Sequence, residues 1–212
     1  MAVIGIDLGT QSLKAIVVDE TLKVRGSNRS AYQPSYPRPG WAEQDSTVWL
    51  DALRPTIEAA LAASSLTAAD IDAISVTGQL DGCLPVGNDG RALAPALIWM
   101  DRRAEAEISG IDPIRVRERT GTVLDPTHMA AKISWFSKHL AHADLVAIWH
   151  QPVSYLVSQL CGHHVLWTTA SHRRRCSTTS IGNAGRTNTS LPSASIANNS
   201  RTSPMQRRSP VR

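Results

Sequence analysis

Residues 4–12, with the sequence IGIDLGTQS, combine the residue types that a phosphate and a metal ion need. The candidate positions in this segment and its continuation are Asp7, Gly9, Thr10, Gln11, Ser12 and Lys14. Glycine lets backbone N–H groups come close to an anion, and Lys14 adds a positive charge. Asp7 would hold Mg²⁺ through water, because this ion gives up its bound waters reluctantly. The segment therefore predicts a phosphate site with a metal ligand beside it.

Phosphoryl transfer is the reaction that suits this set of groups. The reaction depends on positioning, a metal ion and neutralisation of the phosphate charge, and much less on covalent chemistry by the protein. An ordinary β-hairpin with a Gly-Thr turn would contain the same residues without binding anything. The residues of this segment alone leave both interpretations open.

Two apolar runs rich in β-branched residues flank the segment, at 2–7 and 13–19. Such runs on either side of a glycine turn predict a β-hairpin, and residues 22–30 predict a third strand. Residues 73–77 predict a further strand, which ends at Gly78 and Gln79. The candidate phosphate segment is therefore expected at the turn of a hairpin.

The rest of the chain alternates short strands with helices. A helix should begin near Asp45 or Ser46, which are good N-cap residues, and Pro55 should kink or split it. Runs at 84–86 and 96–100 flank a Gly-Asn-Asp-Gly turn and predict a second hairpin. We also predict helices at 101–109, 113–119, 127–141 and 152–160, the last closed by Gly162, and strands at 145–149 and 163–166. Hairpins mixed with helices indicate an α/β layer architecture.

Charge is distributed unevenly along the 212 residues. Eight of the 22 basic residues are arginines beyond position 166, where no Asp, Glu or Lys occurs, so that 14 basic and 18 acidic residues remain in 1–166. The formal net charge of +4 comes from the last segment and does not indicate that the body binds nucleic acid. Residues 167–212 are rich in Ser, Thr, Arg, Asn and Pro, which predicts a disordered tail.

Cysteine usage and hydropathy indicate the compartment. Cys83, Cys161 and Cys176 lack metal-ligand spacing, which is typical of free thiols in a reducing compartment. The N-terminus lacks the basic region of a signal peptide, and no run approaches the roughly 20 apolar residues that cross a membrane. We therefore expect a cytoplasmic protein with no membrane partner, and its oligomeric state is left open.

Five segments in the same order together resemble the FGGY carbohydrate kinases, a family of the actin and hexokinase superfamily. These segments are 7–12 (DLGTQS), 39–45 (PGWAEQD), 75–82 (SVTGQLDG), 95–103 (PALIWMDRR) and 156–164 (LVSQLCGHH). The first looks like the family's first phosphate loop, and the third looks like its GxxGQ strand end on the sugar side. The resemblance implies an α/β fold: an incomplete actin-like ATPase (ribonuclease H-like) domain with a mixed sheet flanked by helices.

The resemblance also implies a sugar or polyol pocket in a cleft between two actin-like domains, with ATP and Mg²⁺ as cofactors. The positions that match the family's substrate side are Gln79, Leu80, Asp81, Trp99, Asp101 and His128. An indole offers a face to a sugar ring, and a carboxylate accepts hydrogen bonds from its hydroxyls. The same resemblance assigns Asp7 to the metal, and Gly9, Thr10, Gln11, Ser12 and Lys14 to the phosphates.

Several of these positions have a purely structural alternative. Trp99 could belong to the core, and Asp101 could cap the helix that follows it, or do so in addition to binding substrate. His128 could be a surface residue or the first residue of a helix. Asp81 is the position that we expect to bind sugar.

The residues after Gln79 differ from the patterns of two known groups of the family. Xylulokinases usually have Gly-Gln-Met-His-Gly where this chain has Gly-Gln-Leu-Asp-Gly, and glycerol kinases usually have Arg-Glu where this chain has Leu80 and Asp81. An acid in place of histidine changes the donor and acceptor pattern that a sugar meets. The sequence as a whole resembles xylulokinase-like members more than glycerol kinases, and it leaves the sugar itself open.

The family's catalytic base, an aspartate in a GxGDxxA-type segment, has no match in these residues, and neither has the nucleotide domain. We therefore expect residues 1–166 to be a partial N-terminal kinase domain that is inactive alone. After residue 166 the likeness stops. When segment 167–181 is back-translated and read from the third base of the Trp167 codon, however, permitted codons encode Asp-His-Gly-Leu-Ala-Ser-Thr-Thr-Met-Leu-Tyr-Asp-Ile. This sequence resembles the one that the family has at that place. We interpret 167–212 as an out-of-frame tail, and a genuine arginine-rich arm for nucleic acid or an acidic partner is the alternative.

Two other functions compete with a sugar kinase. One is a non-catalytic protein that retains sugar binding or a regulatory contact. The other is a different actin-like ATPase, such as a chaperone, and the sugar-side segments 39–45 and 95–103 argue against it.

Overall fold

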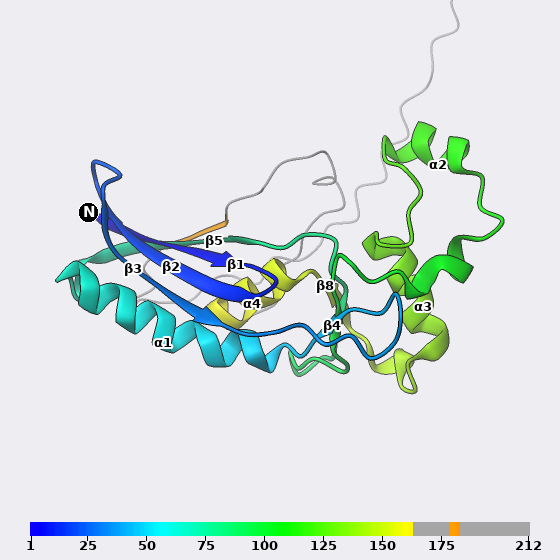
Figure 1. Ribbon diagram of the computed structural model, residues 1–212, viewed down its shortest axis with the longest axis horizontal. Helices are drawn as coiled ribbons and strands as arrows, with labels where there is room; N and C mark the ends of the chain where they lie inside the picture. Colours follow the sequence, from blue (N-terminus) through cyan, green and yellow to red (C-terminus); the bar gives the residue numbers. More distant parts are fainter. Residues whose placement is uncertain (163–178, 183–212) are drawn as a thin grey trace, which may run out of the picture.

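The computed structural model describes residues 1–162 and 179–182, and its largest element is a five-stranded mixed sheet (Figure 1). Its strands are, in spatial order, β3 (Val24–Ala31), β2 (Ser12–Asp19), β1 (Ala2–Leu8), β5 (Ile71–Gly78) and β9 (Thr179–Gly182). The pairs β1–β2, β2–β3 and β5–β9 are antiparallel, whereas β1 and β5 are parallel. The predicted hairpin, third strand and later strand are therefore confirmed.

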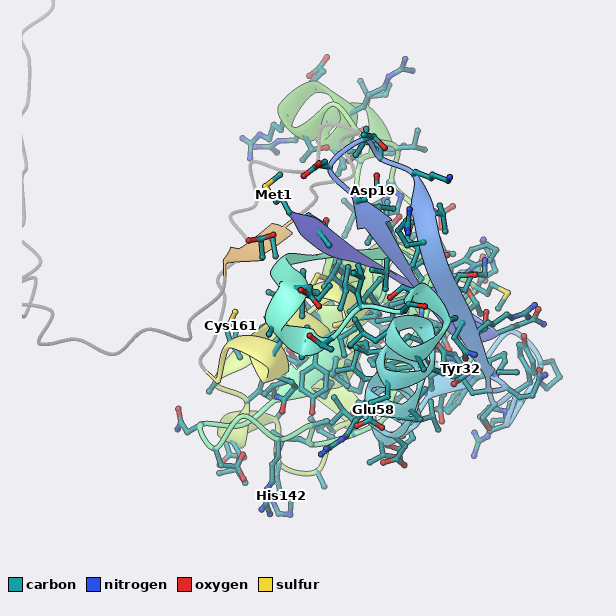
Figure 2. All side chains as sticks on the ribbon, turned by 90° about the vertical axis from the view of Figure 1, so that its left-hand side faces the viewer. Met1, Asp19, Tyr32, Glu58, His142 and Cys161 are labelled. Carbon is teal, nitrogen blue, oxygen red and sulfur yellow. The ribbon has the colours of Figure 1, made fainter. Side chains whose placement is uncertain are left out.

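Two helices cover one face of this sheet, α1 (Thr47–Ser64) and α4 (Pro152–Cys161). Alternate residues of β1 and β2 point into the core on this face because successive side chains of a strand point to opposite sides. Trp49 of α1 and Leu156 of α4 are fully buried in this core. Side chains fill the space between the sheet and the two helices (Figure 2).

The close approach of α1 to the sheet depends on one glycine of β3. A Cβ atom on Gly26 would lie 2.3 Å from the carbonyl oxygen of Ala60, which is backbone of α1 and cannot move aside. A residue without a side chain is therefore required at this crossing. It lets the edge of the sheet pack directly on the helix.

A second, smaller part lies to one side of the sheet and contains α2 (Pro113–Thr120) and α3 (Met129–His139) (Figure 1). The 3-10 helix η2 (Arg103–Ile108) precedes these two helices. This part is completed by two short two-stranded sheets, β4 (Glu43–Gln44) with β7 (Ala96–Leu97), and β6 (Leu84–Val86) with β8 (Ile148–His150). The predicted apolar stripe of α3 packs against Cys83 and Leu97. The two remaining short helices are η1 (Ala68–Asp70) and η3 (Ala143–Leu145).

Three local predictions need correction. The expected hairpin of 84–86 with 96–100 is wrong, because β6 pairs with β8 and β7 pairs with β4. Among the described residues, a single isolated bridge, Cys83–Leu97, joins the residue before the first run to the second run. Pro55 does not split α1, which runs without a break from Thr47 to Ser64. The segment expected as a helix at 101–109 forms the 3-10 helix η2.

Helix ends follow the expected chemistry more closely. The Asp45 carboxylate accepts hydrogen bonds from the backbone N–H and the hydroxyl of Thr47, at 2.9 and 2.8 Å, where α1 begins. Gly162 has a φ of 70° after α4, as predicted for a left-handed C-terminal cap. Of the segment 167–212, only β9 is described, so the predicted tail and its boundary near 166 stay predictions, as does the strand at 163–166, which lies outside the described residues.

Candidate functional site

The loop between β1 and β2 turns tightly and leaves backbone donors free. The Gly9 N–H donates to the carbonyl of Ser12 at 3.0 Å, so this group is used to close the turn. Within the described part of the chain, the N–H groups of Thr10 and Gln11 donate no hydrogen bond. Unused N–H groups at a turn can bind an anion, and they make residues 9–12 a candidate phosphate loop.

Three charged side chains lie in a row across the strands beside this loop. Asp7 of β1 is opposite Lys14 of β2, which is in turn opposite Arg29 of β3. The Lys14 ammonium lies 3.5 Å from the Asp7 carboxylate, and both side chains are about half exposed. Like charges directly opposite each other destabilise a sheet, so the Lys14–Arg29 pair favours an anion nearby. Sequence reasoning missed Arg29, because nothing marks it before the strand register is known.

The loop and these cations line a pocket of about 400 Å³. Its walls are Gly9, Thr10, Gln11, Ser12, Lys14, Arg29, Tyr36, Trp99 and Met100. The pocket thus contains all five residues predicted for the phosphates. Its two cations make it a suitable place for a polyanion.

A second pocket of about 380 Å³ adjoins the first. It is lined by Gly9, Thr10, Gln79, Leu80, Asp81 and Trp99, which include four of the six positions predicted for the substrate. The two pockets share Gly9, Thr10 and Trp99, and the Trp99 indole N–H donates to the Thr10 hydroxyl at 3.0 Å. The indole therefore lies at the boundary between the two pockets.

The parallel pairing of β1 with β5 brings the two pockets together. The Gln79 N–H donates to the carbonyl of Leu8 at 2.9 Å, immediately beyond the last pair of the ladder. A Cβ atom on Gly78 would lie only 2.3 Å from that carbonyl oxygen, so the chains can approach this closely only at a glycine. The carboxyl ends of the two strands consequently place residues 9–12 beside residues 79–81.

The side-chain amide of Gln79 is held in one orientation by Gln44. Gln44 receives the Trp49 indole N–H on its Oε1 at 3.3 Å and donates from Nε2 to the Thr10 carbonyl at 2.7 Å, which fixes its own orientation. Gln79 Nε2 donates to the same Gln44 oxygen at 2.8 Å. Gln79 Oε1 then has no hydrogen-bond partner among the described residues, although it is buried. Gln44 belongs to the segment 39–45, but its sequence context does not reveal this contact.

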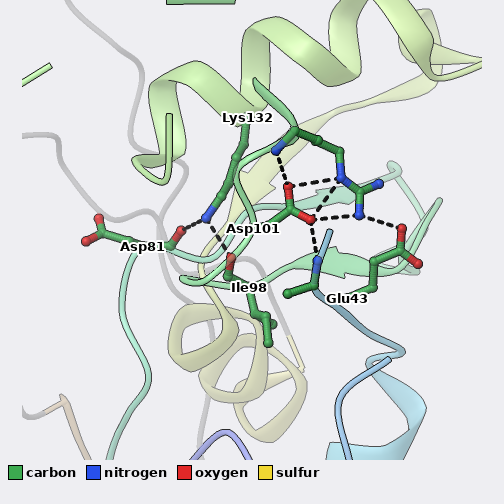
Figure 3. Close-up of polar contacts among 7 residues, drawn as sticks. Glu43, Asp81, Ile98, Asp101 and Lys132 are labelled. Carbon is green, nitrogen blue, oxygen red and sulfur yellow. Dashed lines mark hydrogen bonds and ion pairs between the residues drawn. The ribbon is translucent and has the colours of Figure 1, made fainter. Parts of the chain in front are cut away.

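Asp101 lines neither pocket, which agrees with its structural alternative. Its carboxylate is fully buried, accepts the Ala42 N–H at 2.7 Å and forms a close ion pair with Arg103, whose guanidinium also meets Glu43 (Figure 3). It also accepts the backbone N–H of Arg103 at 3.1 Å, at the start of η2. These partners occupy the carboxylate, so the geometry favours a structural role over contact with a sugar.

His128 also lies outside the lining of both pockets and occupies the position before the first residue of α3. This position agrees with the helix-terminal alternative, and the substrate contact of His128 stays a prediction. Sequence reasoning did not single out two other side chains near the site. The Tyr32 hydroxyl donates to the Gly9 carbonyl at 2.7 Å, and burial together with the Asp7 charge raises the pKa of Tyr32 well above its usual range. Lys132 of α3 is fully buried beside Asp81.

A magnesium ion would depend on Asp7. Among the described residues no group of three or more His, Cys, Asp and Glu side chains could hold a metal. Mg²⁺ is commonly bound by one or two carboxylates with the remaining positions taken by water and substrate phosphates. The single half-exposed carboxylate of Asp7, at the edge of the loop, fits that mode of binding.

Comparison with known proteins supports the interpretation of these features. The sequence profile of the FGGY family of carbohydrate kinases, N-terminal domain, matches residues 2–185. The glycerol kinase of Methylibium petroleiphilum is 33% identical over 183 residues, which cover 81% of this chain and 36% of that protein. The glycerol kinase of Bordetella pertussis is 33% identical over 184 residues, with 82% and 36% covered. The chain thus spans about a third of the length of the curated relatives that it matches.

Solved structures show the same fold. A "xyloylose kinase" from Brucella ovis has a TM-score of 0.71 and 31% identity, and the match covers 74% of this chain and 34% of that one. The xylulose kinase of Rhodospirillum rubrum has a TM-score of 0.68, 27% identity, and coverage of 74% and 33%. These matches confirm the predicted actin-like α/β fold with its mixed sheet. In the described residues, no helix is both long and apolar enough to cross a membrane.

Proposed function

Because the chain belongs to the FGGY family of carbohydrate kinases, we propose that its described part supplies the first phosphate loop and the sugar side of an ATP-dependent kinase. The reaction transfers the terminal phosphoryl group of ATP to a hydroxyl of a sugar or polyol. The family's use of ATP supports a cytoplasmic location, which cell fractionation tests. The family is common to glycerol kinases and xylulose kinases among the relatives, so the substrate is assigned here only as a class.

One observation carries this proposal: the first pocket, with its two cations, and the second pocket meet at Trp99 and Thr10, which share a hydrogen bond of 3.0 Å. A phosphoryl donor and a hydroxyl acceptor must lie next to each other and in line for the transfer. A hairpin turn without function would require neither the second pocket nor the indole between the two.

The residues of the first pocket would hold the phosphates. The N–H groups of Thr10 and Gln11 are free to donate, and Lys14 and Arg29 would balance negative charge. Asp7 would hold Mg²⁺, which supplies charge neutralisation when bound. The substrate oxygen forms the new bond to phosphorus as the bond to ADP breaks, and the hydroxyl proton passes to a base. No segment of this chain resembles the family's base.

The residues of the second pocket would hold the sugar. Asp81 offers a carboxylate to hydroxyl donors, Gln79 offers a fixed amide, and the half-exposed faces of Leu80 and Trp99 offer apolar surface to carbon atoms. We leave Asp101 and His128 out of this set, because neither lines the pocket. A carboxylate at Asp81 favours a ligand rich in hydroxyl donors, of the xylulose, ribulose or glycerol kind, and disfavours a sugar acid.

We further propose that residues 1–212 bind such a ligand without turning it over. The proposal rests on the missing match for the base and on the share of the relatives that the chain covers. The alternative of a non-catalytic sugar-binding protein predicts the same binding, and the two differ only in whether supplying the remaining domain restores turnover.

A coupled assay for ADP release with D-xylulose, D-ribulose and glycerol tests the proposal together with ligand-induced thermal stabilisation. We expect stabilisation by at least one of the three compounds and no ADP release above the background. Asp81→Asn should lose the stabilisation, whereas Asp89→Asn, in an exposed turn outside both pockets, should keep it. Sugar-dependent ADP release by the 212-residue chain would refute the absence of turnover.

A further inference from the structure

Lys132 is a fully buried lysine in the first turn of α3. Its ammonium donates to the carbonyl of Asp81 at 2.6 Å and to the carbonyl of Ile98 at 2.8 Å (Figure 3). The lysine lies far along the sequence from both acceptors, so it joins α3 to two separate loops of the sugar pocket. Neither the phosphate loop nor the family segments include it.

A buried ammonium is costly unless its hydrogen bonds are satisfied, and lysine is almost never fully buried without a partner. Both acceptors here are backbone carbonyls rather than a carboxylate. A side chain that only filled space could be a leucine or methionine of similar volume. The charge is therefore best explained by the two carbonyls that it holds.

One of these carbonyls belongs to a residue that lines the second pocket, and the other belongs to the neighbour of such a residue. Asp81 has a φ of 55°, in the left-handed region that residues other than glycine rarely adopt, and the surrounding structure must hold it there. Ile98 is buried and directly precedes Trp99, which is 48% exposed and also lines the second pocket. One ammonium thus bridges the turn that presents Asp81 and the loop that presents Trp99.

We propose that Lys132 is a positioning residue, which fixes the distance between the Leu80–Asp81 turn and Trp99 and so shapes the sugar pocket. The inference rests on the proposed function for its consequence in sugar binding. The positioning itself concerns only residues of this chain and can be tested without a ligand.

The charges around Lys132 come from several elements. Asp101, Asp81 and Asp125 favour its protonated form, and burial, which acts more strongly, lowers the pKa of Lys132 to about 8. The neighbouring Cys83 thiol is buried, which raises its pKa to about 12, so it stays neutral when Lys132 loses its proton. Lys132 is thus charged at neutral pH, and its deprotonation weakens its bonds to the two carbonyls.

Fluorine NMR of the chain labelled with 5-fluorotryptophan tests the positioning. The six tryptophans give six resonances, and Trp99→Phe identifies that of Trp99. In Lys132→Met we expect the Trp99 resonance to move and the affinity for D-xylulose or glycerol to fall at least tenfold. The control Lys138→Met, an exposed lysine of the same helix, should change neither.

A pH titration of the unaltered chain keeps the test valid if Lys132→Met does not fold. The Trp99 resonance should then titrate with a midpoint near pH 8, and Lys138→Met should behave in the same way. A Trp99 resonance that neither moves in a folded Lys132→Met chain nor titrates in the unaltered one would overturn the inference. A Trp99 resonance that does move, in a chain that binds none of the sugars, would support the positioning and refute the proposed function alone.

Discussion

The buried charge of Lys132 leads to an unusual dependence of stability on pH. In the folded chain, burial lowers the pKa of this lysine from 10.5 to about 8, whereas in the unfolded chain it returns to its ordinary value. Between these two pH values the unfolded state binds more protons than the folded state. Stability must therefore rise with pH over this range, in contrast to lysines and histidines whose pKa is raised by a partner on folding.

The size of the effect follows from the difference between the two pKa values. At about 1.4 kcal/mol for each pH unit, the charged ammonium lowers the free energy of unfolding by about 3 kcal/mol below pH 8. This cost disappears as pH approaches 10.5. The change Lys132→Met removes the titrating group while keeping much of its length, so it should remove the rise. The absolute stability of the Lys132→Met chain also reflects the two backbone carbonyls that lose their hydrogen-bond donor.

Urea denaturation followed by tryptophan fluorescence at half-unit steps from pH 7 to 10.5 measures the effect. We expect the free energy of unfolding of the unaltered chain, relative to that of Lys132→Met, to rise by about 3 kcal/mol between pH 8 and 10.5. Groups other than Lys132 are common to both chains, so the difference between the two curves removes their shared contribution. Lys138→Met should follow the unaltered chain. Parallel curves for the unaltered chain and Lys132→Met would refute the assignment of a lowered pKa to a buried ammonium.

Three further predictions concern the loop, the crossing of the strands and the pocket. Gly78→Ala should lower the free energy of unfolding by about 2 kcal/mol or more in urea denaturation, because the new methyl group would meet the backbone of Leu8; an unchanged midpoint would contradict that contact. Lys14→Met and Arg29→Met should each weaken binding of inorganic tripolyphosphate by about threefold to tenfold in calorimetry at low salt. Equal affinity in the unaltered chain and in both variants would refute an anion site in this pocket. Trp99→Ala should reduce sugar affinity by about tenfold in saturation-transfer NMR, whereas Ile114→Ala, at an exposed position outside the pocket, should not change it. The same loss of affinity in both variants would show that the loss is not specific to the pocket.

The first hairpin and the strand that ends at Gly78 could be predicted from local pattern. Runs of β-branched residues on either side of Gly9 determine the strands, and the pairing of adjacent strands needs no long-range information. The residues that close the phosphate loop are also neighbours in sequence, so the segment 9–12 was found as a unit. Gln79 and Asp81 were found only through their resemblance to the family's sugar-side segment, and the parallel pairing of β1 with β5 places them beside the loop.

Residues whose role depends on tertiary contact could not be predicted in this way. Lys132 lies within an amphipathic helix, and nothing in its sequence context shows that it is buried on two carbonyls from other segments. Gln44 and Arg29 acquire their roles only through the register of other strands. Asp101 shows the opposite case: it matches a family position, yet Ala42 and Arg103 occupy its carboxylate in the fold.

Short strand pairs were the least predictable part of the fold. The turn at 87–90 suggested that 84–86 and 96–100 pair with each other, but each finds a partner far along the chain, β8 and β4 respectively. A ladder of two or three residues has few local signals, and packing against other elements decides its partner. Pro55 also stayed within a continuous helix, because the packing of α1 on the sheet outweighs the loss of one backbone hydrogen bond.

The central claim is that the cleft beside the phosphate loop binds a sugar or polyol through Asp81 and Trp99. Saturation-transfer difference NMR of D-xylulose, D-ribulose and glycerol with the unaltered chain, Asp81→Asn and Asp89→Asn tests it most directly. We predict transfer to at least one of these compounds from the unaltered chain and from Asp89→Asn, and at least a tenfold weaker affinity with Asp81→Asn, because a hydrogen bond to a charged group contributes about 1.5–3 kcal/mol. No transfer to any of the three, or the same affinity in Asp81→Asn as in the unaltered chain, would contradict the account.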